Sequence, residues 1–468
     1  MANHVQGFIR LCQYLQDPHL VAKFQQMCGV KGTFAGKATE IAGQEEETLQ
    51  NGDCILHSAD AETDGLRERK DAIGSGKTAL MNQVNPVPDA EEAAMQSRHW
   101  RLSAAPGSRE EEGKEAACEL SESRQHESRS TVKPLRKNSL TGDVGQEFII
   151  ENKFLFYLFT FGTELGNEMF FIIFFPFLFW NIDAYVSRRL IVVWVLILYL
   201  GQCAKDLIRW TRPASPPVVK VEVFYNTEYS MPSTHAMTGT ALPLSLFLLT
   251  YGRWEYPFMF GLGLVACWSL LVCVSRIYMG MHSVLEVITG FLYSLLILAV
   301  FQPLLNAIDH FYLTHRYAPL VIVTSHVGLG LLAFSLDTWS TSRSDTAQAL
   351  GSGLGAALAS HLNHLLGLMP DPALSRLPLA APPLSAALLA KSFLRLVLGV
   401  VVLLAIKAVM KAVAIPLACR IFGVPADDVR KARQHAPVEL TYRYMVCGTL
   451  GFSCVFLVPV FFSCLNLS

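Results

Sequence analysis

The sequence predicts an all-α protein: a polytopic transmembrane helical bundle that follows a largely disordered polar tail. Two observations lead to this fold class. Hydrophobic residues make up 51% of the 468 residues. From about residue 154 onward they gather in runs close to the roughly 20 apolar residues that a helix needs to cross a bilayer. Residues 31–150 are instead rich in Glu, Ser, Gly and Arg and poor in aromatic residues, a composition typical of disordered chains.

Apolar segments follow the tail, and we expect about 8–10 spans from them. They lie at 154–180, 190–205, 236–251, 256–274, 284–304, 318–336, 347–368, 393–415 and 443–464. The first contains the polar stretch "GTELGNE" at 162–168, so it either crosses as one long helix or breaks into two short ones. The segment at 347–368 is rich in Gly and Ala, which favours close packing of helices in a membrane.

Residues 1–30 show apolar spacing typical of an amphipathic helix, with Phe8, Leu11, Leu15 and Phe24 among the apolar positions. We expect this helix to dock on a protein surface, with a role at the membrane surface as the weaker alternative. The first residues are too polar for a signal peptide, so the first transmembrane helix is expected to direct insertion.

Composition argues against several kinds of partner. The formal net charge is -1 and no basic stripe is evident, so nucleic acid is not an expected partner. The 11 cysteines form no CxxC pair, which argues against a zinc site or a disulfide framework. His361 and His364 are better explained by polar packing than by metal binding. The stretch "GSGKT" at 74–78 resembles a phosphate-binding loop, but Asp71 stands where that loop needs glycine.

Three short stretches place ionisable residues at the ends of predicted spans. They are "KDLIRWTRP" at 205–213, "MPSTHAM" at 231–237 and "SRIYMGMHSVLE" at 275–286. A single Lys or Arg at such a position is most often a membrane anchor. If successive spans alternate in direction, however, all three stretches lie on one face of the membrane. We therefore interpret them together as a functional site, because ionisable residues in membrane segments are costly.

The combined residues suit a multiply charged oxyanion such as phosphate. Lys205, Arg212 and Arg276 supply positive charge, and Ser233 adds a hydroxyl donor. Backbone N–H groups at the start of the third span also favour an anion.

Two histidines near these cations can carry the chemistry. Of His235 and His282, one can attack phosphorus while the other protonates the leaving oxygen. Glu286 follows His282 by four residues, so on a helix the two share a face and the carboxylate can hold the imidazole in one tautomer.

The three-part pattern resembles the signature of the type 2 phosphatidic acid phosphatase superfamily: Lys-x6-Arg-Pro, then Pro-Ser-x-His, then Ser-Arg-x5-His-x3-acid. Thr234, where that superfamily usually has Gly, and the surrounding sequence resemble its sphingosine-1-phosphate phosphatase branch. The resemblance covers roughly residues 150–468 and the stretch "YLQDPHLVAKFQQMCGV" near the start. It implies that residues 151–310 form the catalytic membrane core and that 311–468 add further transmembrane helices.

The resemblance also implies roles for the individual residues. His282 would be the nucleophile that forms a phosphohistidine, His235 the general acid, and Glu286 the residue that orients His282. The phosphate would be bound by Lys205, Arg212, Ser233, Thr234 and Arg276. No metal and no cofactor are implied, the substrate would be a phosphorylated sphingoid base, and the site would be in the endoplasmic reticulum membrane. No oligomeric state is predicted.

Glu286 departs from the family pattern, which has Asp at this position. The extra methylene means that the carboxylate must fold back to reach His282. Three outcomes stay open: Glu286 substitutes adequately, which we favour, it lowers the activity, or the position tolerates either residue.

Two other functions stay open at this stage. One is a phosphatase for another lipid or for a sugar phosphate. The aromatic residues near the motifs mildly favour an amphiphile over a soluble substrate such as a sugar phosphate: Trp210, Phe224, Tyr225, Tyr229 and Tyr278. The other is a non-enzymatic protein that binds lipid phosphates. The side of the membrane on which the polar tail lies also stays open, because basic residues flank the loops too weakly to decide it.

Overall fold

The structure is a computed structural model of the whole chain, and it describes residues 2–33, 132, 147–222, 228–336, 342–425, 432 and 435–467. The region predicted to be a disordered tail lies almost wholly outside the described residues. So do the "GSGKT" stretch and two of the aromatic residues singled out above, Phe224 and Tyr225.

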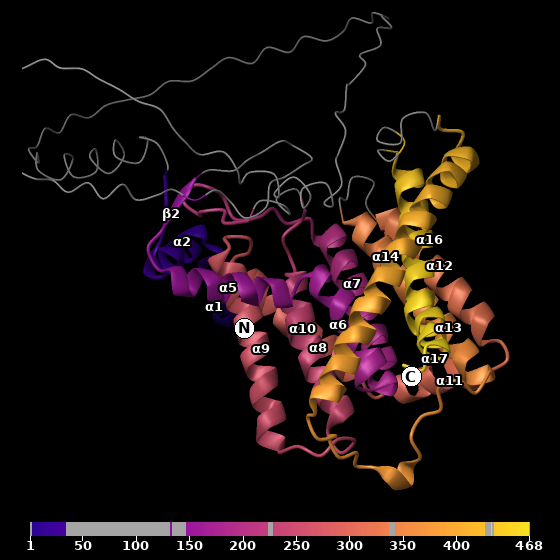
Figure 1. The fold of residues 1–468 in the computed structure, drawn as a ribbon. Helices are drawn as coiled ribbons and strands as arrows, with labels where there is room; N and C mark the ends of the chain where they lie inside the picture. Colours follow the sequence, from indigo (N-terminus) through magenta and orange to yellow (C-terminus); the bar gives the residue numbers. More distant parts are fainter. Residues whose placement is uncertain are drawn as a thin grey trace, which may run out of the picture.

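The described chain is a bundle of α-helices with one small two-stranded sheet, which confirms the all-α class (Figure 1). The elements before the first apolar segment are α1 (Ala2–Gln16), α2 (Pro18–Met27), β1 (Val30–Gly32) and β2 (Phe148–Ile150). The helices of the bundle are α5 (Lys153–Leu165), α6 (Glu168–Asn181), α7 (Ala184–Ile208), α8 (Thr234–Thr250), α9 (Phe258–Tyr278), α10 (Val284–Phe301), α11 (Leu305–Thr314), α12 (Ala318–Leu336), α13 (Arg343–Leu365), α14 (Ala386–Phe422), α16 (Ala436–Phe452) and α17 (Val458–Cys464).

Six of the described helical stretches are long and apolar enough to cross a membrane: α7, α9, α10, α12, α14 and the continuous stretch Ala436–Cys464. The first apolar segment is broken, because α5 and α6 bend by 63° where α5 ends at Gly166. Counted as one span, this pair makes up to seven. Two segments that the sequence predicts to cross the membrane are not long and apolar enough to do so by themselves. They are α8, which has 17 residues, and the more polar α13, and both pack inside the bundle.

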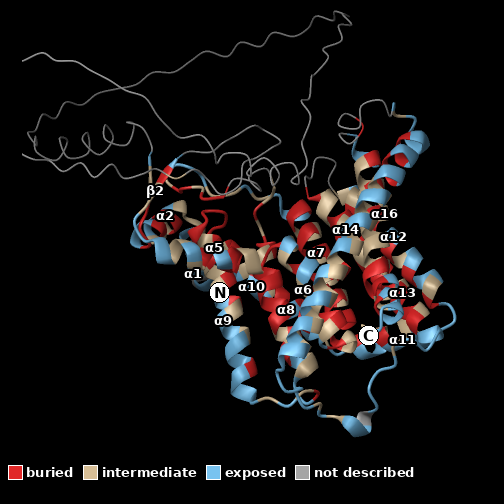
Figure 2. Cartoon of the chain, in the orientation of Figure 1, coloured by how far each residue is buried: buried red, intermediate tan, exposed pale blue. Residues whose placement is uncertain are grey.

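The outer face of the bundle is apolar, as expected for a protein surrounded by lipid. Figure 2 shows long exposed stretches on α9 and α14, and their exposed side chains include Phe260, Leu270, Phe393 and Val401. In water, an exposed apolar surface of this extent would be unfavourable. The protein is therefore a multi-pass membrane protein.

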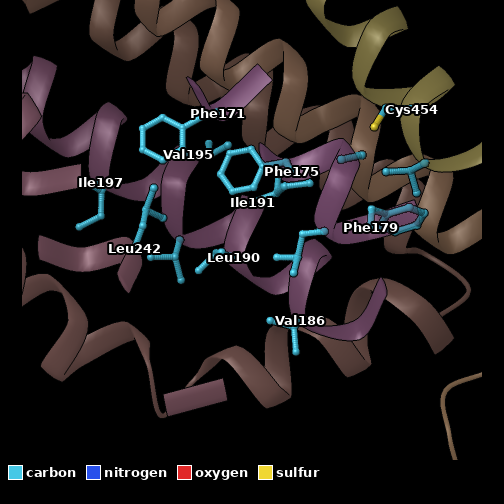
Figure 3. Packing of buried hydrophobic residues seen from close by; sticks show 14 of the residues in the cluster. Phe171, Phe175, Phe179, Val186, Leu190, Ile191, Val195, Ile197, Leu242 and Cys454 are labelled. Atoms are coloured by element: carbon cyan, nitrogen blue, oxygen red, sulfur yellow. The ribbon is translucent and has the colours of Figure 1, made fainter. Parts of the chain in front are cut away.

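The interior is filled by aromatic and branched side chains from α6, α7 and α8. Phe171, Phe175, Leu190, Ile197 and Leu242 pack together in the main core cluster (Figure 3). This core fixes the orientation of α7 and α8, the helices that carry the first two sequence motifs.

Small residues on α13 allow α16 to approach it closely. A Cβ atom added at Gly355 would lie only 1.9 Å from the carbonyl oxygen of Gly448. The packing expected for the Gly- and Ala-rich segment is therefore present, and it joins the C-terminal helices to the bundle.

The N-terminal segment forms two helices because Asp17 caps a new helix that begins at Pro18. On α1 the apolar side chains of Phe8 and Leu11 stay exposed, whereas on α2 Val21 and Gln25 are buried. Beyond α2, β1 pairs antiparallel with β2, an element that the sequence pattern does not predict.

Candidate active site

The three motif stretches meet at one end of the bundle around a small, partly open cavity. The end of α7, the start of α8 and the end of α9 all contribute to its wall. Of the residues predicted from the sequence, six line this cavity: Lys205, Arg212, Thr234, His235, Arg276 and His282. The convergence inferred from alternating spans is therefore present in the fold.

Lys205 and Arg212 approach the same carboxylate. Lys205 lies in the last turn of α7 with its side chain 2% exposed, and its Nζ donates to Glu228 Oε2 at 3.1 Å. Arg212 follows in the loop, where its Nη2 lies 3.8 Å from the same oxygen. The two cations thus converge on one anionic oxygen, as they would on a phosphate oxygen.

Arg276, in the last turn of α9, is fully buried, and its Nη1 donates to Glu222 Oε2 at 3.1 Å. Its Nε and Nη2 atoms, like Nε of Arg212, find no hydrogen-bond partner among the described residues. Buried guanidinium donors without a partner are costly. An anion in the cavity would supply the partner that these donors lack.

Glu222 and Glu228 were missed in the sequence analysis. Both belong to the loop between the first and second motifs, and an acidic residue in a loop between cationic motifs was the available signal. Glu228 pairs with Lys205 and approaches Arg212, and Glu222 pairs with Arg276.

Glu286 contacts His282, as the sequence predicted, but the predicted geometry of a shared helix face is wrong. His282 does not belong to α10, since it precedes the N-cap residue Ser283, so the two side chains do not share a helix face. Instead, Glu286 folds back as the third residue of a capping box. Its Oε2 accepts from the Ser283 N–H at 3.0 Å and lies 3.1 Å from His282 Nδ1.

Ser230 completes this arrangement, because its hydroxyl donates to the same carboxylate oxygen of Glu286. This residue was also missed, although the capping box itself was visible as the pattern Ser-x-x-Glu at 283–286. The additional methylene of the glutamate therefore allows its carboxylate to reach the N-cap N–H of Ser283 in the capping box.

The electrostatic environment keeps His282 neutral. Its Nδ1 carries the proton because it faces the Glu286 carboxylate, which leaves Nε2 with a lone pair, 3.3 Å from Arg212 Nη1. Burial lowers the pKa of His282 well below its ordinary value, and the positive charges of Arg212, Arg276 and Lys205 lower it further. A neutral, oriented imidazole beside a cluster of cations is suited to act as a nucleophile.

The second motif begins α8. Ser233 is the N-cap residue: its hydroxyl accepts from the Ala236 N–H at 3.4 Å, and its own N–H donates to the Glu286 carbonyl at 3.2 Å. Among the described residues that line the cavity, Thr234 and His235 are present and Ser233 is not. Ser233 thus joins the second motif to the third and positions the first turn of α8.

The loops that carry Arg212 and His282 are held together by Lys220. Its Nζ donates to the carbonyls of Pro213 at 2.8 Å and Gly280 at 2.9 Å. Gly280 has a φ of +69°, a conformation that L side chains rarely adopt. The turn at Gly280 brings His282 back over the end of α9.

The described residues contain no group of three or more His, Cys, Asp or Glu side chains arranged to hold a metal ion. His361 Nδ1 donates to the Tyr312 carbonyl at 2.8 Å, which is the polar packing expected for it.

Comparison with known proteins agrees with this site. The family model described as the PAP2 superfamily matches residues 168–308. The chain is 50% identical to sphingosine-1-phosphate phosphatase 1 of Rattus norvegicus over 454 residues, which is 97% of each chain. It is 37% identical to sphingosine-1-phosphate phosphatase 2 of Homo sapiens over 67% of this chain and 79% of that one. It is also 32% identical to a dihydrosphingosine 1-phosphate phosphatase of Schizosaccharomyces pombe over 32% of this chain and 38% of that one.

No solved structure matches the chain. The fold, the three motifs and the family match together define a membrane-embedded lipid phosphatase of the PAP2 superfamily. Within that class, the similarity along nearly the whole chain shows that it belongs to the sphingosine-1-phosphate phosphatase family.

Proposed function

We propose that this phosphatase hydrolyses sphingosine-1-phosphate and related sphingoid base phosphates to the free base and phosphate through a phosphohistidine on His282. The observation that carries the mechanism is the placement of His282 Nε2. His282 lines a cavity with Lys205, Arg212 and Arg276, and its Nε2 lies 3.3 Å from Arg212 Nη1, while Glu286 Oε2 lies 3.1 Å from its Nδ1.

In the first step, His282 Nε2 attacks phosphorus as the bond between phosphorus and the lipid oxygen breaks. His235 gives a proton to that oxygen, and the sphingoid base leaves as a neutral alcohol. The imidazole ring gains positive charge as the N–P bond forms, and the Glu286 carboxylate at Nδ1 stabilises it. The cations offset the negative charge on the phosphoryl oxygens.

In the second step, a water molecule attacks the phosphorus of phosphohistidine. His235, now neutral, accepts a proton from that water, and the N–P bond breaks with its electrons returning to Nε2 of His282. Inorganic phosphate leaves, and both histidines are restored to their starting states. All the proton transfers in this cycle pass through His235, which protonates the lipid oxygen and then accepts a proton from water, while His282 forms and breaks the N–P bond.

The substrate proposal is supported by the relatives, whose names specify phosphates of sphingosine and dihydrosphingosine. We extend the proposal to location and organisation. The chain would reside in the endoplasmic reticulum membrane, with residues 151–310 as the catalytic core and 311–468 as additional helices. Imaging of tagged protein against an endoplasmic reticulum marker tests the location.

The mechanism is tested by phosphate release from sphingosine-1-phosphate by membranes that contain the chain, with a metal chelator present. We expect release to persist with the chelator and to disappear in His282→Ala. Acid-labile, base-stable phosphate on the wild-type chain during turnover would report the phosphohistidine. Full activity of a folded His282→Ala variant would exclude the mechanism.

A further inference from the structure

Two carboxylates line the active-site cavity without a part in the phosphate chemistry. Glu168 lies in the first turn of α6 and Asp345 in the first turn of α13. Among the described residues, no cation forms an ion pair with either of them. From the part of the chain that the structure describes, Asp345 Oδ1 accepts only long hydrogen bonds, from Ser344 Oγ and Gln348 Nε2 at 3.4 Å each.

A third acceptor lies in the same wall. Gln202, on α7 one turn before Lys205, is 3% exposed and lines the cavity. Its Oε1 is buried and has no hydrogen-bond partner among the described residues. A buried acceptor without a donor is unfavourable unless a ligand supplies one.

The nearby cations Lys205 and Arg443 pair with other carboxylates and not with Glu168 or Asp345. Lys205 donates to Glu228 instead. Arg443 lies within electrostatic range of Glu168 and Asp345, but it pairs with Glu439 at 2.8 Å and is not among the described residues that line the cavity. The cavity therefore has a cationic part, which suits phosphate, and an acceptor-rich part, which suits a cationic donor.

We propose that Glu168, Asp345 and the Oε1 of Gln202 form a subsite for the ammonium group of the substrate. The inference rests on the proposed function. In a sphingoid base phosphate the phosphate is on carbon 1, a protonated amine is on carbon 2 and a hydroxyl is on carbon 3. An ammonium group so close to the phosphate enters the same cavity as the phosphate and donates to these acceptors.

This subsite would select against phosphate esters without an amine, such as those built on glycerol. Such a substrate leaves two carboxylates and an amide oxygen desolvated and without a cationic donor. A site built to bind a polar group of its substrate rejects analogues that lack that group. Because hydrogen bonds to charged groups are the stronger ones, we expect a selectivity of about 10- to 100-fold in kcat/KM.

The first experiment compares kcat/KM of the full-length wild-type protein for sphingosine-1-phosphate and for the matched analogue with hydrogen in place of the amine. A preference of about 10-fold or more for the amine is expected. Equal values for the two substrates would overturn the subsite and leave the phosphatase intact. If neither substrate releases phosphate, the proposed function itself fails, so the two failures are distinguishable.

The second experiment repeats the comparison with Glu168→Gln and Asp345→Asn, each of which removes charge with little change in size. We expect KM for sphingosine-1-phosphate to rise and the preference for the amine to fall about 10-fold. Glu255→Gln changes an exposed carboxylate outside the cavity and serves as the matched control. Equal losses on both substrates would show that the carboxylates only support the starts of their helices, and would refute the subsite.

Discussion

Glu286 Oε2 lies 3.1 Å from His282 Nδ1 and at the same time accepts the Ser283 N–H at 3.0 Å. One carboxylate oxygen therefore caps α10 and orients the imidazole. The relationship explains how a glutamate serves where the family pattern has an aspartate, since the additional methylene spans the first turn of the helix.

Glu286→Asp is expected to lower the rate of phosphate release rather than raise it. The shortened side chain cannot reach both Ser283 N–H and His282 Nδ1, and a displacement of about 1 Å at a reacting group costs on the order of 100-fold. The measurement is kcat for sphingosine-1-phosphate at equal amounts of folded protein. A rate equal to or above that of the wild type would contradict the capping-box explanation.

The acid limb of the pH–rate profile is expected to lie well below pH 6.5. In the proposed mechanism His282 attacks only as the neutral imidazole, and burial together with Arg212, Arg276 and Lys205 lowers its pKa in the folded protein. The pKa of His282 is higher in the unfolded chain, so the contribution of this residue to folding stability is complete above that higher value. It declines as the pH falls through the folded pKa.

Measurements of kcat/KM from pH 4 to 8, on a substrate whose own ionisation is corrected for, test this prediction. The fall in activity on the acid side should come below the ordinary histidine value of about 6.5. A midpoint at or above that value would mean that the surrounding cations do not control His282.

Gly280→Ala is expected to destabilise the protein and to displace His282. The φ of +69° is unfavourable for alanine, and the added Cβ would lie 2.3 Å from the Val219 carbonyl oxygen. We expect a loss of about 1–3 kcal/mol in the free energy of unfolding together with reduced activity. Gly263→Ala, in an exposed part of α9 with nothing within 4 Å of the added atom, is the matched control and should be tolerated.

Gln25→Leu is expected to weaken the contact of α2 with the active-site loops. The Gln25 side chain donates to the carbonyls of Val219 at 2.7 Å and Tyr278 at 2.8 Å and accepts from the Val219 N–H at 3.0 Å. The substitution leaves these buried backbone groups without partners, at a cost of about 2–4 kcal/mol.

The midpoint of thermal unfolding in detergent, measured beside Gln26→Leu at an exposed position of the same helix, tests the role of Gln25. A lower midpoint and lower activity for Gln25→Leu alone are expected. Equal behaviour of the two variants would show that α2 is dispensable for the catalytic core.

Much of the site could be predicted from the sequence because its residues occur in three compact motifs at the ends of apolar segments. Lys205, Arg212, Arg276, His235 and His282 all line the cavity as predicted. Ser233 does not, because the hydroxyl of the residue before a helix is drawn to the free N–H groups of the first turn.

The partners of these residues could not be predicted in the same way. Glu228 meets Lys205, and Glu222 meets Arg276, only after the loop between the motifs has folded back over the cavity. Glu168 and Asp345 are separated by 177 positions in the numbering, and their helices come together only through packing of the bundle.

The sequence by itself determined the membrane-bundle class and the three charged motifs, because the length of an apolar segment and the charges at its ends are local properties of the chain. Only the tertiary structure decided that α5 and α6 break, that α2 docks through Gln25, and that acceptors gather beside the phosphate site. These features depend on contacts between distant segments, and such contacts follow from the packing of whole helices rather than from any short pattern of residues.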